Sequence, residues 1–128
     1  MNYSTAKPKR ALLAALAASS VTPIVLAHHS FAMFDAQQTL TAEGTVKDFQ
    51  WGNPHVWLDV LVHQPDGGVK SLSLELNGIS GLVRHGWKPA TLHPADKVKV
   101  TYHPLRDGAP GGQLIEVVTA DGTVLKGQ

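Results

Sequence analysis

Histidine is the residue type best suited to chemistry in this chain of 128 residues, which holds seven histidines and no cysteine. All seven lie after residue 27. Histidine is the commonest protein ligand of metal ions, and its ring also accepts and donates protons near neutral pH. Without cysteine, a metal site here would use nitrogen and oxygen ligands and no thiolate. The positions of the histidines therefore decide which site the sequence predicts.

His28 is the most informative of them, because the residues before it have the order of a secretory signal. Three basic residues lie within the first ten, an apolar run covers residues 11–18, and Ala27 supplies a small residue for cleavage. The apolar run is shorter than the ~20 residues of a membrane-spanning helix. We therefore expect residues 1–27 to be removed, leaving a periplasmic or secreted protein that begins at His28 and has no membrane span.

Cleavage at Ala27 would give His28 a free α-amine beside its ring. The two nitrogens can bind one ion, and one further imidazole would complete a near-planar site of three nitrogens, called a histidine brace, that suits Cu(II). His55 is the best partner, because it begins a predicted strand on the face opposite the apolar side chains. The predicted metal ligands are His28, His29 and His55, with copper as the ion. The alternative is that His28 and His29 are solvated and that His55 bonds to the backbone of a turn.

The other histidines give weaker signals. His85 lies at the end of a predicted helix, and His93 and His103 each precede a proline in predicted loops. We expect these three to be solvated or hydrogen-bonded. Zinc bound by a histidine together with Glu75 or Asp35 remains an alternative, although no HxH or HxxxH pair supports it.

Three tryptophans suggest a different kind of site. Trp51 and Trp57 flank Asn53, and exposed indole rings there would form a stacking surface for a flat ligand. The second hypothesis is therefore a metal-free domain that binds a small molecule or an envelope protein through Trp51, Asn53, Trp57 and Trp87. The alternative is that the tryptophans belong to the core.

Charge and motifs exclude several classes of function. The signal holds three of the 11 Lys and Arg and none of the ten Asp and Glu, so the mature chain has eight basic and ten acidic residues, a net charge of −2. Such a chain lacks the basic field that attracts nucleic acid. The sequence contains no GxSxG, HExxH or phosphate-binding glycine motif. Binding is therefore favoured over catalysis, and a copper oxidase is the less favoured third hypothesis.

Alternating apolar residues predict a chain rich in β-strands. The predicted strands are Leu40–Trp51, His55–His63, Val69–Leu76, one around Val98–Tyr102, Gln113–Ala120 and a short last one at Thr123–Leu125. A short helix over residues 78–85 is predicted between the third and fourth strands, with Asn77 as its N-cap and Gly86 as its stop. A glycine- and proline-rich loop is predicted over Asp107–Gly112.

The order of three strands, a helix and two or more strands predicts a mainly β, OB-like barrel of five to six strands. A β-sandwich is the alternative, but it offers no natural place for the helix. The predicted division is a signal at 1–27, an N-terminal leader at 28–39 and the barrel at 40–128.

Four blocks of sequence carry a family resemblance. They read HHSFAMFD, GTVKDFQWGNPHVWL, LVRHGWKPATLHPADKVKVTYHPLRDG and GGQL. Together they resemble a family of uncharacterised bacterial envelope domains, known only as a domain of unknown function, over residues 28–125. The resemblance implies an envelope location and a single domain, and it supplies no mechanism.

Overall fold

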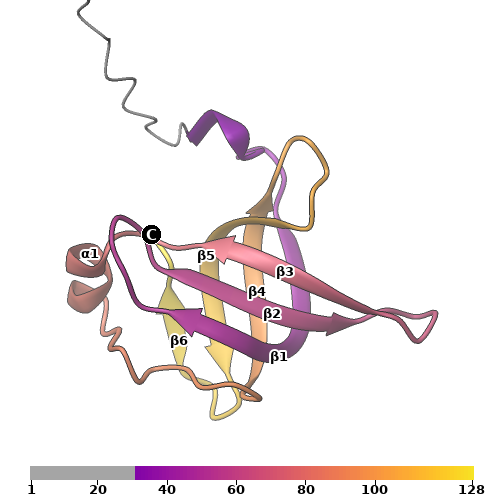
Figure 1. The fold of residues 1–128 in the computed structure, drawn as a ribbon. Helices are drawn as coiled ribbons and strands as arrows, with labels where there is room; N and C mark the ends of the chain where they lie inside the picture. Colours follow the sequence, from indigo (N-terminus) through magenta and orange to yellow (C-terminus); the bar gives the residue numbers. More distant parts are fainter. Residues whose placement is uncertain (1–30) are drawn as a thin grey trace, which may run out of the picture.

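The computed structural model describes residues 31–128, which form a small β-barrel with one short α-helix (Figure 1). The elements in chain order are the 3-10 helix η1 (Phe31–Met33), strands β1 (Leu40–Gln50), β2 (Trp57–His63) and β3 (Val69–Glu75), helix α1 (Ile79–Arg84), and strands β4 (Lys97–Pro104), β5 (Gly111–Thr119) and β6 (Val124–Lys126). This order confirms the predicted OB-like architecture. The predicted signal, together with His28, His29 and Ser30, lies outside the described residues.

One parallel pairing closes the barrel. β1 pairs with β2 and β4, β2 pairs with β3, and β4 pairs with β5, all antiparallel. β3 and β5 then pair in parallel, which joins the two ends of the five-stranded sheet, and β6 extends beyond β5. Because the sheet closes on itself, the alternative of a β-sandwich is wrong. Closure also leaves few unpaired strand edges.

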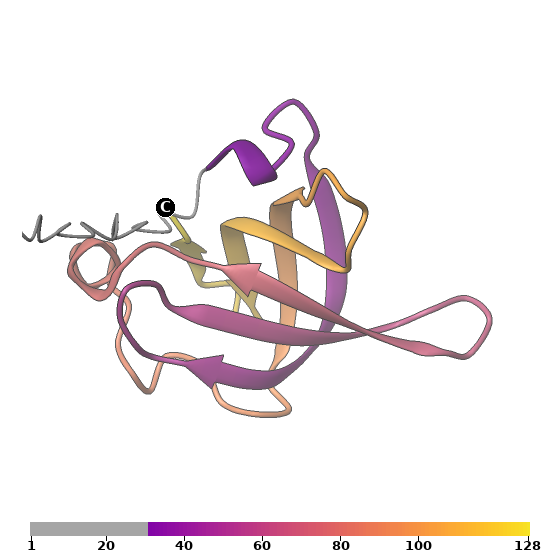
Figure 2. The same ribbon diagram turned by 45° about the horizontal axis from the view of Figure 1, so that its top comes forward.

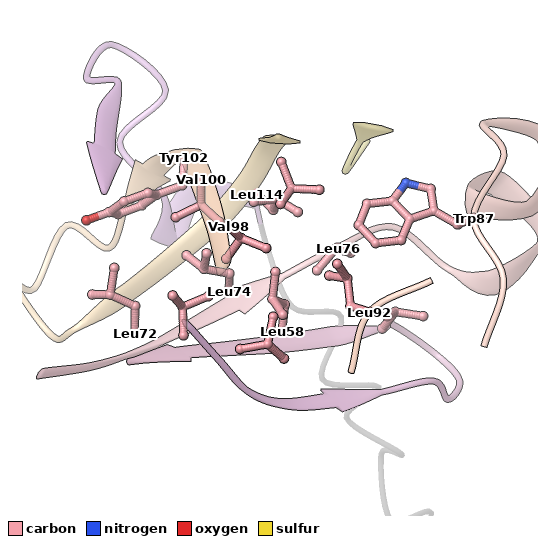
Figure 3. Packing of buried hydrophobic residues seen from close by; sticks show 14 of the residues in the cluster. Leu58, Leu72, Leu74, Leu76, Trp87, Leu92, Val98, Val100, Tyr102 and Leu114 are labelled. Carbon is pink, nitrogen blue, oxygen red and sulfur yellow. The ribbon is translucent and has the colours of Figure 1, made fainter. Parts of the chain in front are cut away.

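The core lies inside the barrel, where the inward faces of the strands meet (Figure 3). Val56, Leu58 and Val60 alternate with more exposed neighbours and are fully buried, as the period of two predicts. β2 itself begins at Trp57, two residues later than predicted. Full burial of such aliphatic side chains contributes ~1.5–3 kcal/mol each to the hydrophobic stabilisation.

Two glycines predicted to lie in a loop instead begin β5. Gly111 and Gly112 are buried and pair with Ser73 and Leu74 of β3. A Cβ at Gly111 would fall against the carbonyl oxygen of Ser73, and one at Gly112 against that of His103. The prediction of a loop as far as Gly112 was therefore wrong, because these glycines allow the close approach of backbones that closes the barrel.

Helix α1 begins one residue later than its predicted cap implies. The N-cap is Gly78, and no side chain caps the helix. Asn77 instead continues the strand pairing, since its amide donates to Gly127 and its carbonyl accepts from Val56. The prediction of Asn77 as N-cap was therefore wrong. Gly86 ends the helix as predicted, with φ +87° and its amide donating to Val83.

The segment after η1 packs onto the barrel beside the end of β4. Phe34 is buried and forms a bridge with Leu105. Arg106 holds the segment twice, through its amide to the carbonyl of Met33 at 3.0 Å and through Nε to the carbonyl of Ala32 at 3.1 Å. The start of η1 thereby lies on the side of the barrel where β3 ends and where the C-terminus lies (Figures 1 and 2). Within residues 31–128, no helix is long and apolar enough to cross a membrane.

Candidate functional site

A histidine that precedes β2 and a glutamate that ends β3 meet at this side of the barrel. Nδ1 of His55 lies 2.6 Å from Oε1 of Glu75. His55 precedes β2, directly after a turn in which the Asn53–Pro54 peptide bond is cis, and Glu75 is the last residue of β3. The antiparallel register that pairs Trp57 with Glu75 brings the two side chains together.

Glu75 is the one charged residue that is buried in the described part of the chain, with 5% of its surface exposed. Its Oε2 atom is also buried and has no hydrogen-bond partner within residues 31–128. A buried carboxylate is costly unless it is paired. The contact with His55 is therefore the interaction that offsets the burial of Glu75 here.

The pair fixes how His55 presents its ring. A carboxylate accepts, so Nδ1 carries the hydrogen and donates it, and the lone pair of the neutral ring lies on Nε2. No contact of Nε2 is found within the described residues, and the His55 side chain is 28% exposed. Histidines that bind metals nearly always donate their second ring N–H to a carboxylate or a carbonyl in this way. His55 is thus oriented as a nitrogen ligand.

His103, like His55, donates a hydrogen bond through Nδ1 of its ring. Its Nδ1 lies 2.6 Å from the carbonyl oxygen of Gln38, which can only accept, so Nε2 again holds the lone pair. His103 pairs with Gln113 of β5, and Gln113 pairs with Glu75 of β3. His103 and Glu75 thus stand two strands apart, on either side of Gln113. His103 is hydrogen-bonded, as one of the two expectations had it, but it lies in β4 and not in the predicted loop.

The remaining histidines of the described chain lie elsewhere. His63 ends β2 and His85 caps the C-terminus of α1, both exposed. His93 is 66% exposed in its side chain and lies 3.7 Å from a carboxylate oxygen of Asp96. Within residues 31–128, no group of three or more His, Asp or Glu is arranged to hold a metal ion. A brace would need His28, which lies outside these residues together with His29.

The tryptophans divide into buried and half-buried residues. Trp87 is 1% exposed, and its indole N–H donates to the carbonyl of Lys126 at 2.7 Å, which places it in the core (Figure 3). Trp51 is half-buried and packs against Phe49, with ring centroids 5.9 Å apart. Trp57 is half-buried beside Glu75. Trp51 and Trp57 therefore remain as residues that a ligand could contact, together with the exposed Asn53.

Comparison with known proteins adds a family but no function. A model of the family described as "Family of unknown function (DUF6152)" matches residues 15–114. No curated protein and no solved structure matches the chain significantly.

Proposed function

We propose that this chain, which belongs to the DUF6152 family of unknown function, is an exported domain that binds Cu(II) through the amino-terminal His28 and through His55. The α-amine and ring of His28 would supply two nitrogens, and Nε2 of His55 would supply the third. Such a set of nitrogen ligands suits Cu(II) in near-planar geometry. The domain would deliver, store or sense copper in the cell envelope.

The His55–Glu75 pair is the observation that carries this proposal. A turn histidine without a function needs no buried carboxylate, and burying Glu75 costs stability unless the charge is compensated. A metal ligand does gain from such a partner, which fixes the orientation of the ring and raises its basicity. Oε2 of Glu75 has no hydrogen-bond partner within the described residues. The side-chain carboxylate therefore depends on His55 for its pairing, which adds to this argument.

The proposed site requires His28 to reach His55 from the start of η1. Figures 1 and 2 show the start of η1 on the side of the barrel where β3 ends at Glu75. Two residues separate His28 from Phe31, which makes three residue steps, and an extended chain spans ~3.3–3.6 Å per step. His28 could therefore lie up to about 10 Å from Phe31. Arg106 bonds to the carbonyls of Ala32 and Met33 and so fixes the position of η1, from which His28 extends.

The test is copper binding by the mature protein, with its first residue confirmed by mass spectrometry. We expect one Cu(II) per chain and an axial electron paramagnetic resonance spectrum with hyperfine structure from three nitrogens. Replacing His55→Gln should remove one nitrogen from the spectrum and weaken binding at least tenfold. The matched control His93→Gln should leave both unchanged. Binding of Zn(II) with equal affinity and no dependence on His55 would contradict the proposal.

The metal-free alternative uses the same surface, because Trp57 stands opposite Glu75 in the strand register. A half-buried indole there could stack on a flat ligand. Tryptophan fluorescence of the metal-free protein distinguishes the two functions. A saturable change with sugars or aromatic compounds, abolished by Trp57→Leu, would favour the alternative, whereas an unchanged signal favours copper binding.

A further inference from the structure

A concave site lies at one mouth of the barrel, apart from the His55–Glu75 pair. A cavity of about 390 Å³ lies between β3, β4 and the loop that leads into β5. This volume falls in the range of pockets for small ligands, which are often found at the mouths of β-barrels. Its polar lining comes from Asp35, Gln38, Lys70, Tyr102 and Arg106. None of these residues belongs to the proposed copper site.

Lys70 occupies an unusual position for a charged residue. Along β3 it shares the face of Leu72 and Leu74, both of which are buried in the core. Because side chains alternate along a strand, Lys70 belongs to the inward-facing row at the point where the barrel opens. Within residues 31–128 it forms no ion pair and no hydrogen bond through its side chain. An ammonium group is thus available to a molecule in the cavity.

The hydroxyl group of Tyr102 belongs to a second residue that lines the cavity. Its ring packs in the core with 8% of the residue exposed, and Figure 3 shows its oxygen directed away from the other core side chains. No hydrogen bond to this hydroxyl is present in the described part of the protein. The oxygen is not fully enclosed by protein, so it can donate to a molecule in the cavity. Burial also raises the pKa of Tyr102 above 10, so the group remains a hydrogen-bond donor at neutral pH.

The third donor is the guanidinium of Arg106. Its Nε donates to Ala32, and NH1 lies 3.6 Å from Oδ1 of Asp35. Asp35 is the one acidic residue of the lining, and its Oδ2 accepts from the side-chain Nε2 of Gln38 at 2.8 Å. The lining therefore carries two positive charges and one negative charge. The charge balance and the unpaired donors both favour an anion.

The apolar part of the lining restricts the ligand further. Leu40, Leu72, Pro104 and Pro110 complete the wall and would pack against a hydrocarbon body rather than a hydrated inorganic ion. We propose that this cavity binds a small organic anion, with its carboxylate or phosphate group held by Lys70, Arg106 and the hydroxyl of Tyr102. The site is independent of the proposed copper site, and the test therefore uses protein freed of metal with EDTA.

The experiment is nuclear magnetic resonance titration of the 15N-labelled mature protein with benzoate, phenyl phosphate and benzyl alcohol. Benzoate and phenyl phosphate compare the two acidic groups, and benzyl alcohol has the same ring without the charge. We expect at least one of the anions to shift the amide signals of Tyr102, Gly108 and Gly111 saturably. Benzyl alcohol should bind at least tenfold more weakly.

Variants then test the proposed contacts. Lys70→Gln and Tyr102→Phe should each weaken binding of the anion at least threefold, while the exposed Lys88→Gln, away from the cavity, should not. Thermal unfolding of each variant shows whether it is folded. The proposal would be overturned if the anions shifted the amide signals around His55 instead, or if benzyl alcohol bound with equal affinity. It would also be overturned if Lys70→Gln bound the anion as tightly as the native protein. Finally, it would be overturned if 10 mM of either anion, about the scale of a very weak ligand, caused no shift.

Discussion

Nδ1 of His55 donates to a carboxylate oxygen of Glu75 at 2.6 Å, and the two residues are brought together by the pairing of β2 with β3. The contact joins a solvent-accessible ring to a buried acid. It gives His55 a fixed orientation in which Nδ1 is used by Glu75 and the lone pair is on Nε2. The predictions on the proposed function follow from this arrangement.

Glu75→Gln should weaken Cu(II) binding about 10–100-fold, the usual effect of removing a partner that orients a metal-ligating histidine. The glutamine keeps the shape of the side chain but removes its charge, so the fold should persist. Competition with a chelator of known affinity measures the change. The control Glu43→Gln replaces an acid whose side chain is 78% exposed and should bind copper as the native protein does. Equal affinity of the Glu75 variant would contradict the role given to this residue.

His55→Ala should destabilise the metal-free fold by about 1–3 kcal/mol, because it leaves the buried Glu75 carboxylate without its partner. Chemical denaturation of the metal-free protein measures this loss. Adding Glu75→Gln to His55→Ala should recover part of it, since the unpaired charge is then gone. Strictly additive losses in the double variant would show that the two side chains do not interact.

Gly112→Ala should destabilise the barrel by about 1–3 kcal/mol or more, because the new Cβ would fall against the carbonyl oxygen of His103 where β4 and β5 pair. Gly52→Ala is the matched control. A Cβ at Gly52 meets no atom within 4 Å and its φ is not positive, so its stability should change by less than about 0.5 kcal/mol. Similar stabilities of the two variants would contradict the described close approach of β4 and β5 at Gly112.

Tyr102 should titrate above pH 10, because burial raises its pKa in the folded protein. The other tyrosine is Tyr3, which lies in the predicted signal, so absorbance at 295 nm would report Tyr102 alone in the mature protein. The unfolded chain releases this proton near pH 10 while the folded protein retains it. Stability should therefore fall as the pH rises beyond 10. Ionisation at or below pH 10 would show that the hydroxyl is not buried as described.

The architecture of this protein was predictable because its strands alternate strongly. Val56, Leu58 and Val60 mark one face of β2 without reference to any other residue, and the helix between β3 and β4 distinguishes an OB-like barrel from a sandwich. Local patterns were less informative where tertiary pairing overrides them. Asn77 has the residue type of a helix cap, but its backbone bonds to Val56 and Gly127 instead. Gly111 and Gly112 resemble a loop but begin a strand.

The candidate site was only partly predictable. His55 was identified from its place at the start of a predicted strand, and Glu75 was considered only as a zinc ligand. Their contact depends on the register of β2 with β3, which the sequence of either strand does not state. The cavity residues Tyr102 and Arg106 gave no sequence signal, because they come from segments separate from each other and from Lys70. Lys70 on the apolar face of its strand is the one hint that the sequence offered.

The measurement that tests the central claim most directly is the affinity for Cu(II) of two forms of the mature protein, one beginning at His28 and one with a single alanine added before it. The added residue moves the free amine away from the His28 ring and leaves every described residue unchanged. The proposal predicts that the extended form binds Cu(II) at least tenfold more weakly and loses the three-nitrogen spectrum. Equal affinity and identical spectra in the two forms would contradict it.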